Sequence, residues 1–134
     1  HKWVSNRIRF MPMEEVDRFM DGIYFERVAI KRMIKDYNDL DLIGLVITID
    51  NELKGFAVGE KINADTASVI IEKTDFETLG CVQFIFREFS RLLREKYSVQ
   101  YINVGDDMGF DDLKGVKMSY NPTKLIPKYT IYQK

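Results

Sequence analysis

Histidine and cysteine are almost absent from this chain of 134 residues, which contains one of each. A single cysteine excludes an internal disulfide bond. The only histidine, His1, begins the sequence without an initiating methionine before it, so we interpret it as the remnant of a tag or of a domain boundary. A histidine-based triad and most zinc sites are therefore disfavoured, and we expect no metal site. Any chemistry would have to use carboxylates, lysines, tyrosines or backbone amides.

Strong net charge and long apolar runs are also missing. The formal net charge is −1, which removes the bulk attraction that drives sequence-independent nucleic-acid binding, so we expect no DNA partner. No apolar run reaches about 18 residues and no signal peptide is visible, so we expect no membrane span and a cytoplasmic location. The hydrophobic fraction of 46% and the charged fraction of 31% are typical of a globular protein, and the length fits one domain over residues 1–134.

The spacing of apolar residues predicts four helices. Between residues 13 and 38 these residues recur at helical spacing, and Gly22 is interpreted as a break, which predicts two short helices. A longer helix is predicted to start near Asp75 or Leu79 and to end near Tyr97, because its apolar residues fall on one stripe. Residues 111–117 are predicted to form a short fourth helix.

Five strands are predicted, at residues 42–50, 55–61, 67–73, 99–104 and 128–132. Turns at residues 51–54 and 63–65 connect the first three strands, which would follow one another as an antiparallel meander. The third of these contains an uninterrupted Val-Ile-Ile run, which indicates burial on both faces of the sheet. The predicted order is therefore two helices, three strands, a helix, a strand, a short helix and a strand.

Polar residues gather where two of the predicted strands end. Glu72 and Lys73 close the third strand, and residues 101–122 hold two acidic pairs, three glycines, two lysines and a Ser-Tyr pair. A polar group that is drawn inside a protein must find a hydrogen-bond partner or destabilise the core. A segment that served folding alone would not need so many polar groups, so we expect the functional residues here.

Each candidate residue has a functional and a structural interpretation. Glu72 could accept a proton from an incoming amine while Lys73 holds a phosphate or carboxylate, or the two could form an exposed ion pair. Asn103 and Asp107 could bind a ligand where a strand gives way to a loop, or could stabilise turns. The acidic loop lacks the alternating ligands of a calcium-binding loop.

The segment before Pro122 offers a further group of candidates. Lys117, Ser119 and Tyr120 are predicted to lie on extended chain, with Lys117 and Ser119 pointing one way and Tyr120 the other. Tyr120 could act as a general acid or could bury its ring and satisfy its hydroxyl on the backbone. Cys81 stands near a predicted helix start, which would lower the pKa of its thiol, yet a small core residue is the preferred interpretation.

Several of these residues follow one another in the order of a known family. They are Glu72-Lys73, Gly80, Arg87-Glu88-Phe89, Asn103, Asp107, Gly109, Leu113, Lys117, Ser119-Tyr120 and Pro122. The pattern resembles the C-terminal domain of bacterial phosphatidylglycerol lysyltransferases, usually the second of two domains that resemble GNAT N-acyltransferases. The match covers residues 54 to 129. It departs at Val104 and Gly105, where the family usually has polar side chains, and at Lys114, where it commonly has arginine.

The resemblance implies a fold and an activity. The fold would be α/β (α+β) and GNAT-like, with a mixed, mostly antiparallel sheet and helices on both faces, as the C-terminal half of a longer tandem protein. The activity would be acyl or aminoacyl transfer without a required cofactor, from aminoacyl-tRNA or a small-molecule acyl donor such as acyl-CoA. Glu72 and Tyr120 would be catalytic. The substrate-binding residues would be Lys73, Asn103, Asp107, Lys117 and Ser119.

Two alternatives stay open beside this interpretation. GNAT enzymes hold the pyrophosphate of acyl-CoA on a glycine-rich loop before a helix, whereas residues 74–80 here contain one glycine and two carboxylates that would repel phosphate. An acyl-CoA-dependent N-acetyltransferase is therefore the less favoured alternative. The other is a non-catalytic ligand-binding or interaction module, which Val104 and Gly105 favour. A missing N-terminal domain or a second copy of the chain would be the protein partner.

Overall fold

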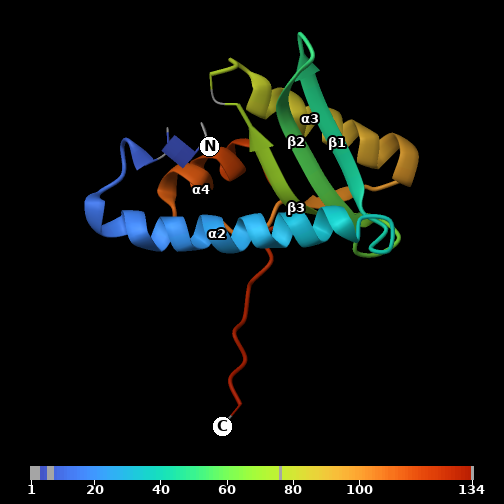
Figure 1. Ribbon diagram of the computed structural model, residues 1–134. Helices are drawn as coiled ribbons and strands as arrows, with labels where there is room; N and C mark the ends of the chain where they lie inside the picture. The colour runs from blue at the N-terminus through green and yellow to red at the C-terminus, as the bar shows by residue number, and fades with distance from the viewer. Residues whose placement is uncertain (1–3, 6–7, 76, 134) are drawn as a thin grey trace. The chain divides into compact units, whose positions relative to one another are not determined.

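The computed structural model describes residues 4–5, 8–75 and 77–133 and divides into two compact units, His1–Asn103 and Val104–Lys134 (Figure 1). The first unit contains α2 (Met13–Lys35), β1 (Ile43–Ile49), β2 (Glu52–Lys61), β3 (Thr66–Thr74), α3 (Cys81–Tyr97) and β4 (Tyr101–Asn103). The second unit contains α4 (Asp111–Ser119).

The sheet of the first unit has the order β1-β2-β3-β4. Neighbouring strands are antiparallel from β1 to β3, which confirms the predicted meander, and β4 runs parallel to β3. The β1–β2 turn places Asp50 and Asn51 at φ angles of 52° and 62°, a left-handed region that these two residue types tolerate. β2 begins at Glu52, so only residues 50–51 form the turn and the predicted turn at 51–54 was too long.

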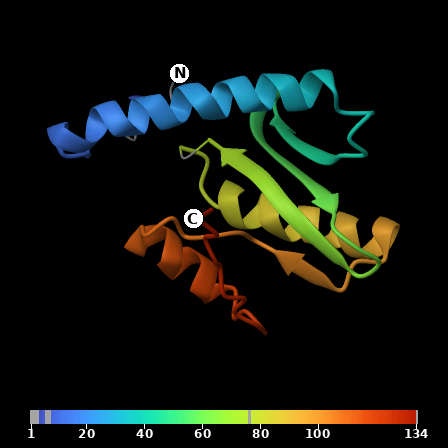
Figure 2. The same ribbon diagram turned by 90° about the horizontal axis from the view of Figure 1, so that it is seen from below.

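Helices cover both faces of this sheet, as predicted: α2 lies on one face and α3 on the other (Figures 1 and 2). The α3 side chains of Ile85, Phe89 and Leu93 are fully buried. They meet a small-residue layer of the sheet that includes Ala57 and Ala67. A 17-residue helix with one apolar stripe can bury that stripe only against a second layer, so the main hydrophobic core lies between α3 and the sheet.

The prediction of two short helices in residues 13–38 was wrong, because α2 is one continuous helix through Gly22. Six of its seven half-buried positions, all except Val28, keep a spacing of three and four residues on both sides of this glycine. They are Val16, Phe19, Ile23, Glu26, Ile30 and Met33. A single glycine weakens a helix by about 1 kcal/mol, which an uninterrupted stripe of packing contacts outweighs.

Three predictions about the C-terminal part of the chain were also wrong. Residues 128–132 form no strand, and Tyr129 and Ile131 are largely exposed. The strand predicted at 99–104 is confined to β4, and α4 continues to Ser119 through positions predicted to be extended. Alternating apolar residues favour a strand, but a strand forms only where a neighbour satisfies its backbone groups, and the sequence pattern does not show that neighbour.

The centre of the sheet contains an irregularity that affects the candidate site. The register between β2 and β3 shifts between Val58 and Gly59, where Val58 faces Ile71 and Gly59 faces Val69. Ile70 therefore has no opposite residue and is 46% exposed, so the prediction that β3 is buried on both faces holds only in part. Beyond the shift, Glu72 lies opposite Ala57 and Lys73 lies opposite Phe56, and this pairing determines the face of the sheet on which each side chain lies.

Candidate functional site

Glu72 and Lys73 point to opposite faces of the sheet. Glu72 lies opposite Ala57, which belongs to the core on the α3 side, and Lys73 lies opposite Phe56. Residues directly opposite each other share a face, and consecutive residues of a strand alternate between faces. The carboxylate of Glu72 is therefore on the α3 side and the ammonium of Lys73 on the α2 side. The structure does not bring these two groups together.

The carboxyl group of Glu72 is strongly perturbed by its surroundings. Its side chain is half-buried near the start of α3, and burial raises the pKa of this carboxyl to about 7. Among the described residues, none donates a hydrogen bond to the Glu72 carboxylate or forms an ion pair with it. A carboxylate in this state can take up a proton near neutral pH, which is what a general base requires.

The loop after Glu72 is held by its own carboxylate. Asp75 Oδ1 accepts a hydrogen bond from the backbone N–H of Glu77 at 3.0 Å, and Asp75 Oδ2 lies 3.3 Å from Lys54 Nζ. The hydroxyl of Thr78 also donates to Asp75 Oδ2, at 3.4 Å. Hydrogen bonds to Glu52 and then to Asp75 raise the pKa of Lys54. Asp75 and Lys54 are thus structural residues of this loop, a role that the sequence pattern does not indicate.

The start of α3 differs from both predicted positions. The helix begins at Cys81 after Gly80, whose φ angle is 77°, and no side chain caps it. Asp75 accepts hydrogen bonds from the backbone N–H groups of Glu77 and Thr78, which stabilise a turn. The helix begins only after this turn. Cys81 is buried, and its thiol lies 3.6 Å from the carbonyl oxygen of Lys54. Burial raises the pKa of this thiol, so the expected lowering by the helix start was wrong.

Lys73 joins β3 to α2. Its Nζ lies 3.0 Å from Glu26 Oε1, and both side chains are partly shielded from water. Beside this ion pair, α2 and the sheet enclose an open groove of about 350 Å³. The groove is lined by Glu26, Ala29, Ile30, Met33, Leu40, Leu42, Glu60, Ile70 and Ile71. Lys73 therefore already has an anionic partner, which a phosphate or carboxylate of a substrate would have to replace.

In the second unit, the acidic residues of the loop before α4 stabilise turns. Asp106 Oδ1 accepts a hydrogen bond from the backbone N–H of Met108 at 3.0 Å, and Asp107 Oδ1 accepts one from Gly109 at 2.9 Å. Lys128 lies 2.7 Å from the other carboxylate oxygen of Asp106, and this hydrogen bond is the main cause of the lowered pKa of Asp106. These contacts agree with the structural interpretation of Asp106 and Asp107, in which both side chains stabilise turns.

Lys117 and Ser119 are helical, and the predicted alternation on an extended segment was wrong. Residues two apart on a helix are about 200° apart around its axis, so these side chains do not share a face. Lys117 Nζ donates to the carbonyl oxygens of Val104 and Asp106 at 2.6 Å each. Burial lowers the pKa of Lys117. Ser119 Oγ donates to the carbonyl of Val116, and Tyr120 is the half-buried C-cap of α4.

The predicted site residues are thus distributed between the two units. Glu72, Lys73 and Asn103 belong to the first unit, and Asp107, Lys117, Ser119 and Tyr120 belong to the second. Within the first unit, Asn103 pairs with Ser68, four residues before Glu72 on β3, which corresponds to about 13 Å along a strand. Within this set, Glu72 is the residue whose carboxylate has no hydrogen-bond or ion-pair partner among the described residues.

Neither a membrane-spanning helix nor a cluster of metal ligands is found in the part of the chain that the structure describes. No helix there combines the length and the apolar character that crossing a bilayer requires. Across residues 4–5, 8–75 and 77–133, no three His, Cys, Asp or Glu side chains gather closely enough to hold a metal ion.

The sheet order, the two helical layers and the irregular centre of the sheet define a GNAT-type fold. Solved acetyltransferases share it at low sequence identity. An aminoglycoside acetyltransferase from an uncultured soil metagenomic sample has a TM-score of 0.60 and 16% identity, with 92% of each chain covered. A ribosomal-protein-alanine N-acetyltransferase from Brucella melitensis has a TM-score of 0.54 and 12% identity, with 69% of this chain and 71% of that chain covered.

The chain belongs to the family described as phosphatidylglycerol lysyltransferase, C-terminal, whose model matches residues 6–132. This confirms the resemblance that the motifs indicated. A conserved protein of unknown function from Bacteroides thetaiotaomicron has a similar structure, with a TM-score of 0.74 and 27% identity. The match covers 92% of this chain but 41% of that relative, so this chain spans less than half of its length. Among curated proteins, none matches the sequence.

Proposed function

We propose that this chain is an acyltransferase-type domain that transfers an aminoacyl group, with Glu72 as the general base. One observation carries the proposal: a half-buried carboxyl group with a pKa of about 7 lies at the end of β3, on the α3 face. Burial disfavours a charged carboxylate, so a purely structural glutamate would normally have a cation or hydrogen-bond donors nearby. The family and the acyltransferase fold support the reaction type.

The proposed reaction moves one acyl group and balances its protons. Glu72 removes a proton from the attacking amine or hydroxyl, whose nitrogen or oxygen forms a bond to the carbonyl carbon of the aminoacyl ester. The resulting oxyanion would be stabilised by backbone N–H groups of β3. The groups proposed for this lie beyond Ser68, where β3 no longer pairs with β4. The ester C–O bond then breaks, and the proton held by Glu72 passes through solvent to the leaving oxygen, which returns Glu72 to its ionised form.

The loop before α3 supports a donor other than acyl-CoA. A diphosphate is held at a helix start by free backbone N–H groups, but Asp75 accepts the N–H of Glu77 and places negative charge there. We therefore propose an aminoacyl ester such as aminoacyl-tRNA as the donor. Lys73 lies on the other face of the sheet from Glu72, and Asp107, Lys117 and Ser119 bond within the second unit, so none of these four is proposed to bind the donor beside Glu72. Asn103 stays a proposed binding residue of the first unit, and no cofactor is proposed. A calorimetric titration with acetyl-CoA should give no heat at millimolar ligand.

The test is a transfer assay with the Glu72→Gln variant, because glutamine keeps the shape of the side chain but cannot accept the proton. We expect kcat to fall by about 100-fold or more, and the rise of kcat/KM around pH 7 to disappear. The matched control is Glu95→Gln, an exposed glutamate on α3. Retention of full activity and of the pH profile by Glu72→Gln would exclude Glu72 as the base.

A second candidate is a non-catalytic binding module, and the contacts of the second unit favour it. Lys117, Ser119 and Asp107 all bond to the backbone within that unit. Equilibrium binding of labelled aminoacyl-tRNA separates the two functions. Tight binding without turnover by the wild-type chain would identify the binding module, whereas turnover that depends on Glu72 would identify the transferase.

A further inference from the structure

The helix α2 exposes a second face beside the one that packs on the sheet. The first face is the half-buried stripe from Val16 to Met33 defined above. The second, which we call the outer face, lies about 130° around the helix axis at 100° per residue. It consists of Met13, Asp17, Met20, Asp21, Tyr24, Arg27, Val28, Lys31 and Lys35. Val28 is half-buried and the other eight residues are exposed.

Large apolar side chains lie at the centre of this helix in contact with water. Tyr24 is 63% exposed, and the neighbouring Phe25 is 69% exposed. Their rings meet edge to face with centroids 5.7 Å apart. Met20, one turn before Tyr24, is 42% exposed. Exposed aromatic and methionine side chains that cluster in this way are enriched at protein–protein contacts.

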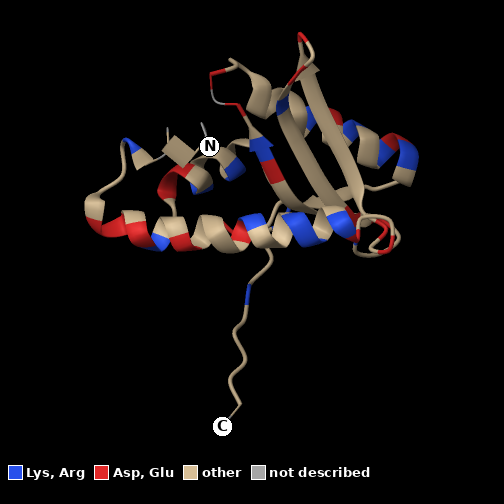
Figure 3. Cartoon of the chain, viewed as in Figure 1, with Lys and Arg blue, Asp and Glu red and all other residues tan. Residues whose placement is uncertain are grey.

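Charge is divided between the two halves of α2 (Figure 3). Residues 13–23 contain four carboxylates and one arginine, whereas residues 25–35 contain four cations and one carboxylate. The two exceptions, Arg18 and Glu26, do not belong to the outer face, and Glu26 is paired with Lys73. The outer face therefore carries Asp17 and Asp21 in its first half and Arg27, Lys31 and Lys35 in its second.

The helix dipole does not explain this pattern. Carboxylates near a helix N-terminus and cations near its C-terminus are favourable, but the effect falls off within the first and last turns. Asp21 and Arg27 lie in the central turns, on either side of Tyr24. Across residues 4–5, 8–75 and 77–133, none of Asp17, Asp21, Arg27 and Lys31 has an ion-pair partner. These four charged groups are therefore available to an external partner.

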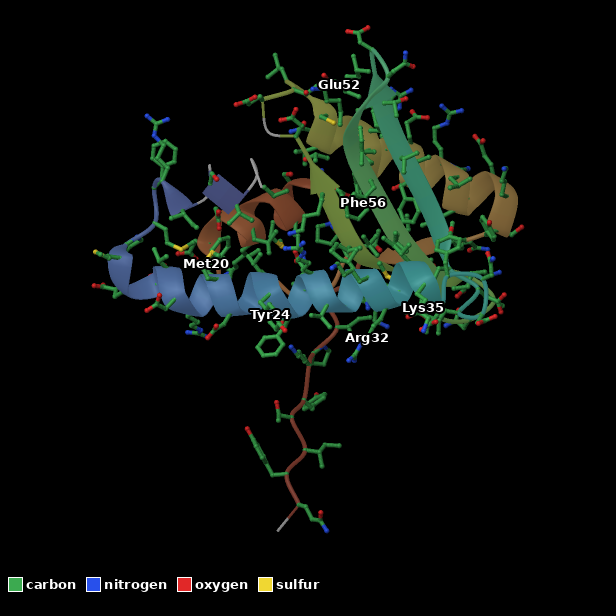
Figure 4. All side chains as sticks on the ribbon, in the orientation of Figure 1. Met20, Tyr24, Arg32, Lys35, Glu52 and Phe56 are labelled. Atoms are coloured by element: carbon green, nitrogen blue, oxygen red, sulfur yellow. The ribbon has the colours of Figure 1, made fainter. Side chains whose placement is uncertain are left out.

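The outer face is complementary to itself. Tyr24 is the central residue of Met13–Lys35, and Figure 4 shows it between Met20 and the basic end at Arg32 and Lys35. A two-fold axis through Tyr24 would set two copies of α2 antiparallel and would place residue i opposite residue 48 − i. Asp17 then faces Lys31 of the other copy, and Asp21 faces Arg27. Met20 faces Val28, and Tyr24 meets its own counterpart.

We propose that α2 is the interface of a homodimer, in which the outer faces of two copies pack antiparallel around Tyr24. A two-fold interface uses the same patch on both copies, so each charge pair occurs twice. Tyr24, Met20 and Val28 of the outer face supply the buried apolar contact, and the flanking pairs fix the register and orientation. The occupant of this face is thus a second copy of the chain.

Charge reversal tests the register directly. Asp17→Lys places a lysine opposite Lys31, and Lys31→Asp places an aspartate opposite Asp17, so each variant alone repels itself at two symmetric positions. We expect each substitution to raise the dimer dissociation constant by roughly tenfold or more in sedimentation equilibrium of the 134-residue chain. In an equimolar mixture, the lysine introduced in one variant faces the aspartate introduced in the other, so the mixture should recover the dimer. The double variant should recover it as well.

The matched control is Asp39→Lys, which makes the same charge change at an exposed position of the turn after α2 and should leave the dimer unchanged. All of these substitutions are on exposed residues, so circular dichroism should show folded protein in every sample. A monomeric wild-type chain at the highest soluble concentration would overturn the proposal. A dimer that Asp17→Lys does not weaken, or a mixture that does not recover it, would overturn it as well.

Discussion

At the scale of single residues, Glu72 has a carboxyl group whose surroundings oppose its charged form. Its pKa is about 7 in the folded chain against 4.5 for a free glutamate, because the folded chain withdraws it from water. Between these two values the folded state holds a proton that the unfolded state has lost. The free energy of unfolding therefore falls as pH rises from 4.5 to 7, and the full penalty remains above pH 7.

Glu72→Gln should remove this penalty. We expect the variant to be more stable than the wild-type chain at pH 8 by roughly 1–2 kcal/mol, a value reduced for partial screening by water, and equally stable at pH 4. Urea unfolding at the two pH values measures the difference, with Glu95→Gln as the control that should be neutral at both. A stabilisation that is the same at pH 4 and pH 8 would show that ionisation of Glu72 is not its cause.

Lys117 makes the opposite kind of contribution, because it holds a loop together. Its ammonium binds the carbonyls of Val104 and Asp106, which fixes the loop before α4. Lys117→Met removes both hydrogen bonds, so the amides of residues 104–110 should exchange with deuterium roughly tenfold faster. The control is Lys114→Met, an exposed lysine of the same helix. Unchanged exchange in Lys117→Met would contradict the proposed structural role.

At the scale of elements, two glycines with opposite requirements allow a matched test. A Cβ on Gly59 would collide with the carbonyl oxygen of Ser68 and press on the ring of Phe89, whereas a Cβ on Gly22 would meet nothing within 4 Å. Gly59→Ala should therefore destabilise the chain by about 1–3 kcal/mol. Gly22→Ala should stabilise it by about 0.5–1 kcal/mol through helix propensity.

Thermal unfolding of the two alanine variants measures this contrast. An increase in stability for Gly59→Ala would mean that β2 and β3 separate more easily than the register shift indicates. A decrease for Gly22→Ala would mean that this side of α2 is covered in solution.

Local sequence patterns predicted an element well where its stabilising contacts come from residues nearby in the sequence. The α3 stripe and the β1–β2 hairpin depend on neighbours within a few residues, and both were predicted near their observed positions. The start of α3 was misplaced because a side-chain contact, Asp75 to the N–H of Glu77, binds the turn before the helix. Residues 128–132 were misassigned because a strand depends on a distant partner.

The candidate site was predictable in part for a similar reason. The sequence identified Glu72 as the residue at a strand end, and the family motif supported it. It could not show that Lys73 pairs with Glu26, because that contact joins residues 47 positions apart on separate elements. Nor could it show that Lys117 lies on α4, where helix propensity and the hydrogen bonds to residues 104 and 106 outweigh an alternating pattern.

At the scale of the whole molecule, burial is concentrated in the first unit. Its hydrophobic core comprises Ile43, Ala57, Ala67, Ile85, Phe89, Leu93 and Val99. No described residue after position 103 is fully buried. Amides in β2, β3 and α3 should therefore exchange only through global unfolding, while those of α4 and residues 121–133 should exchange earlier. Hydrogen exchange with mass spectrometry measures this order, and equal protection of α3 and α4 would contradict it.

The two sides of β3 can be altered separately. Because Glu72 and Lys73 project to opposite sides of one pleated strand, substitutions around the α2 groove can change what that side recognises without altering the carboxyl group beside α3. A protein engineer could therefore vary the groove residues while leaving Glu72 in its half-buried position.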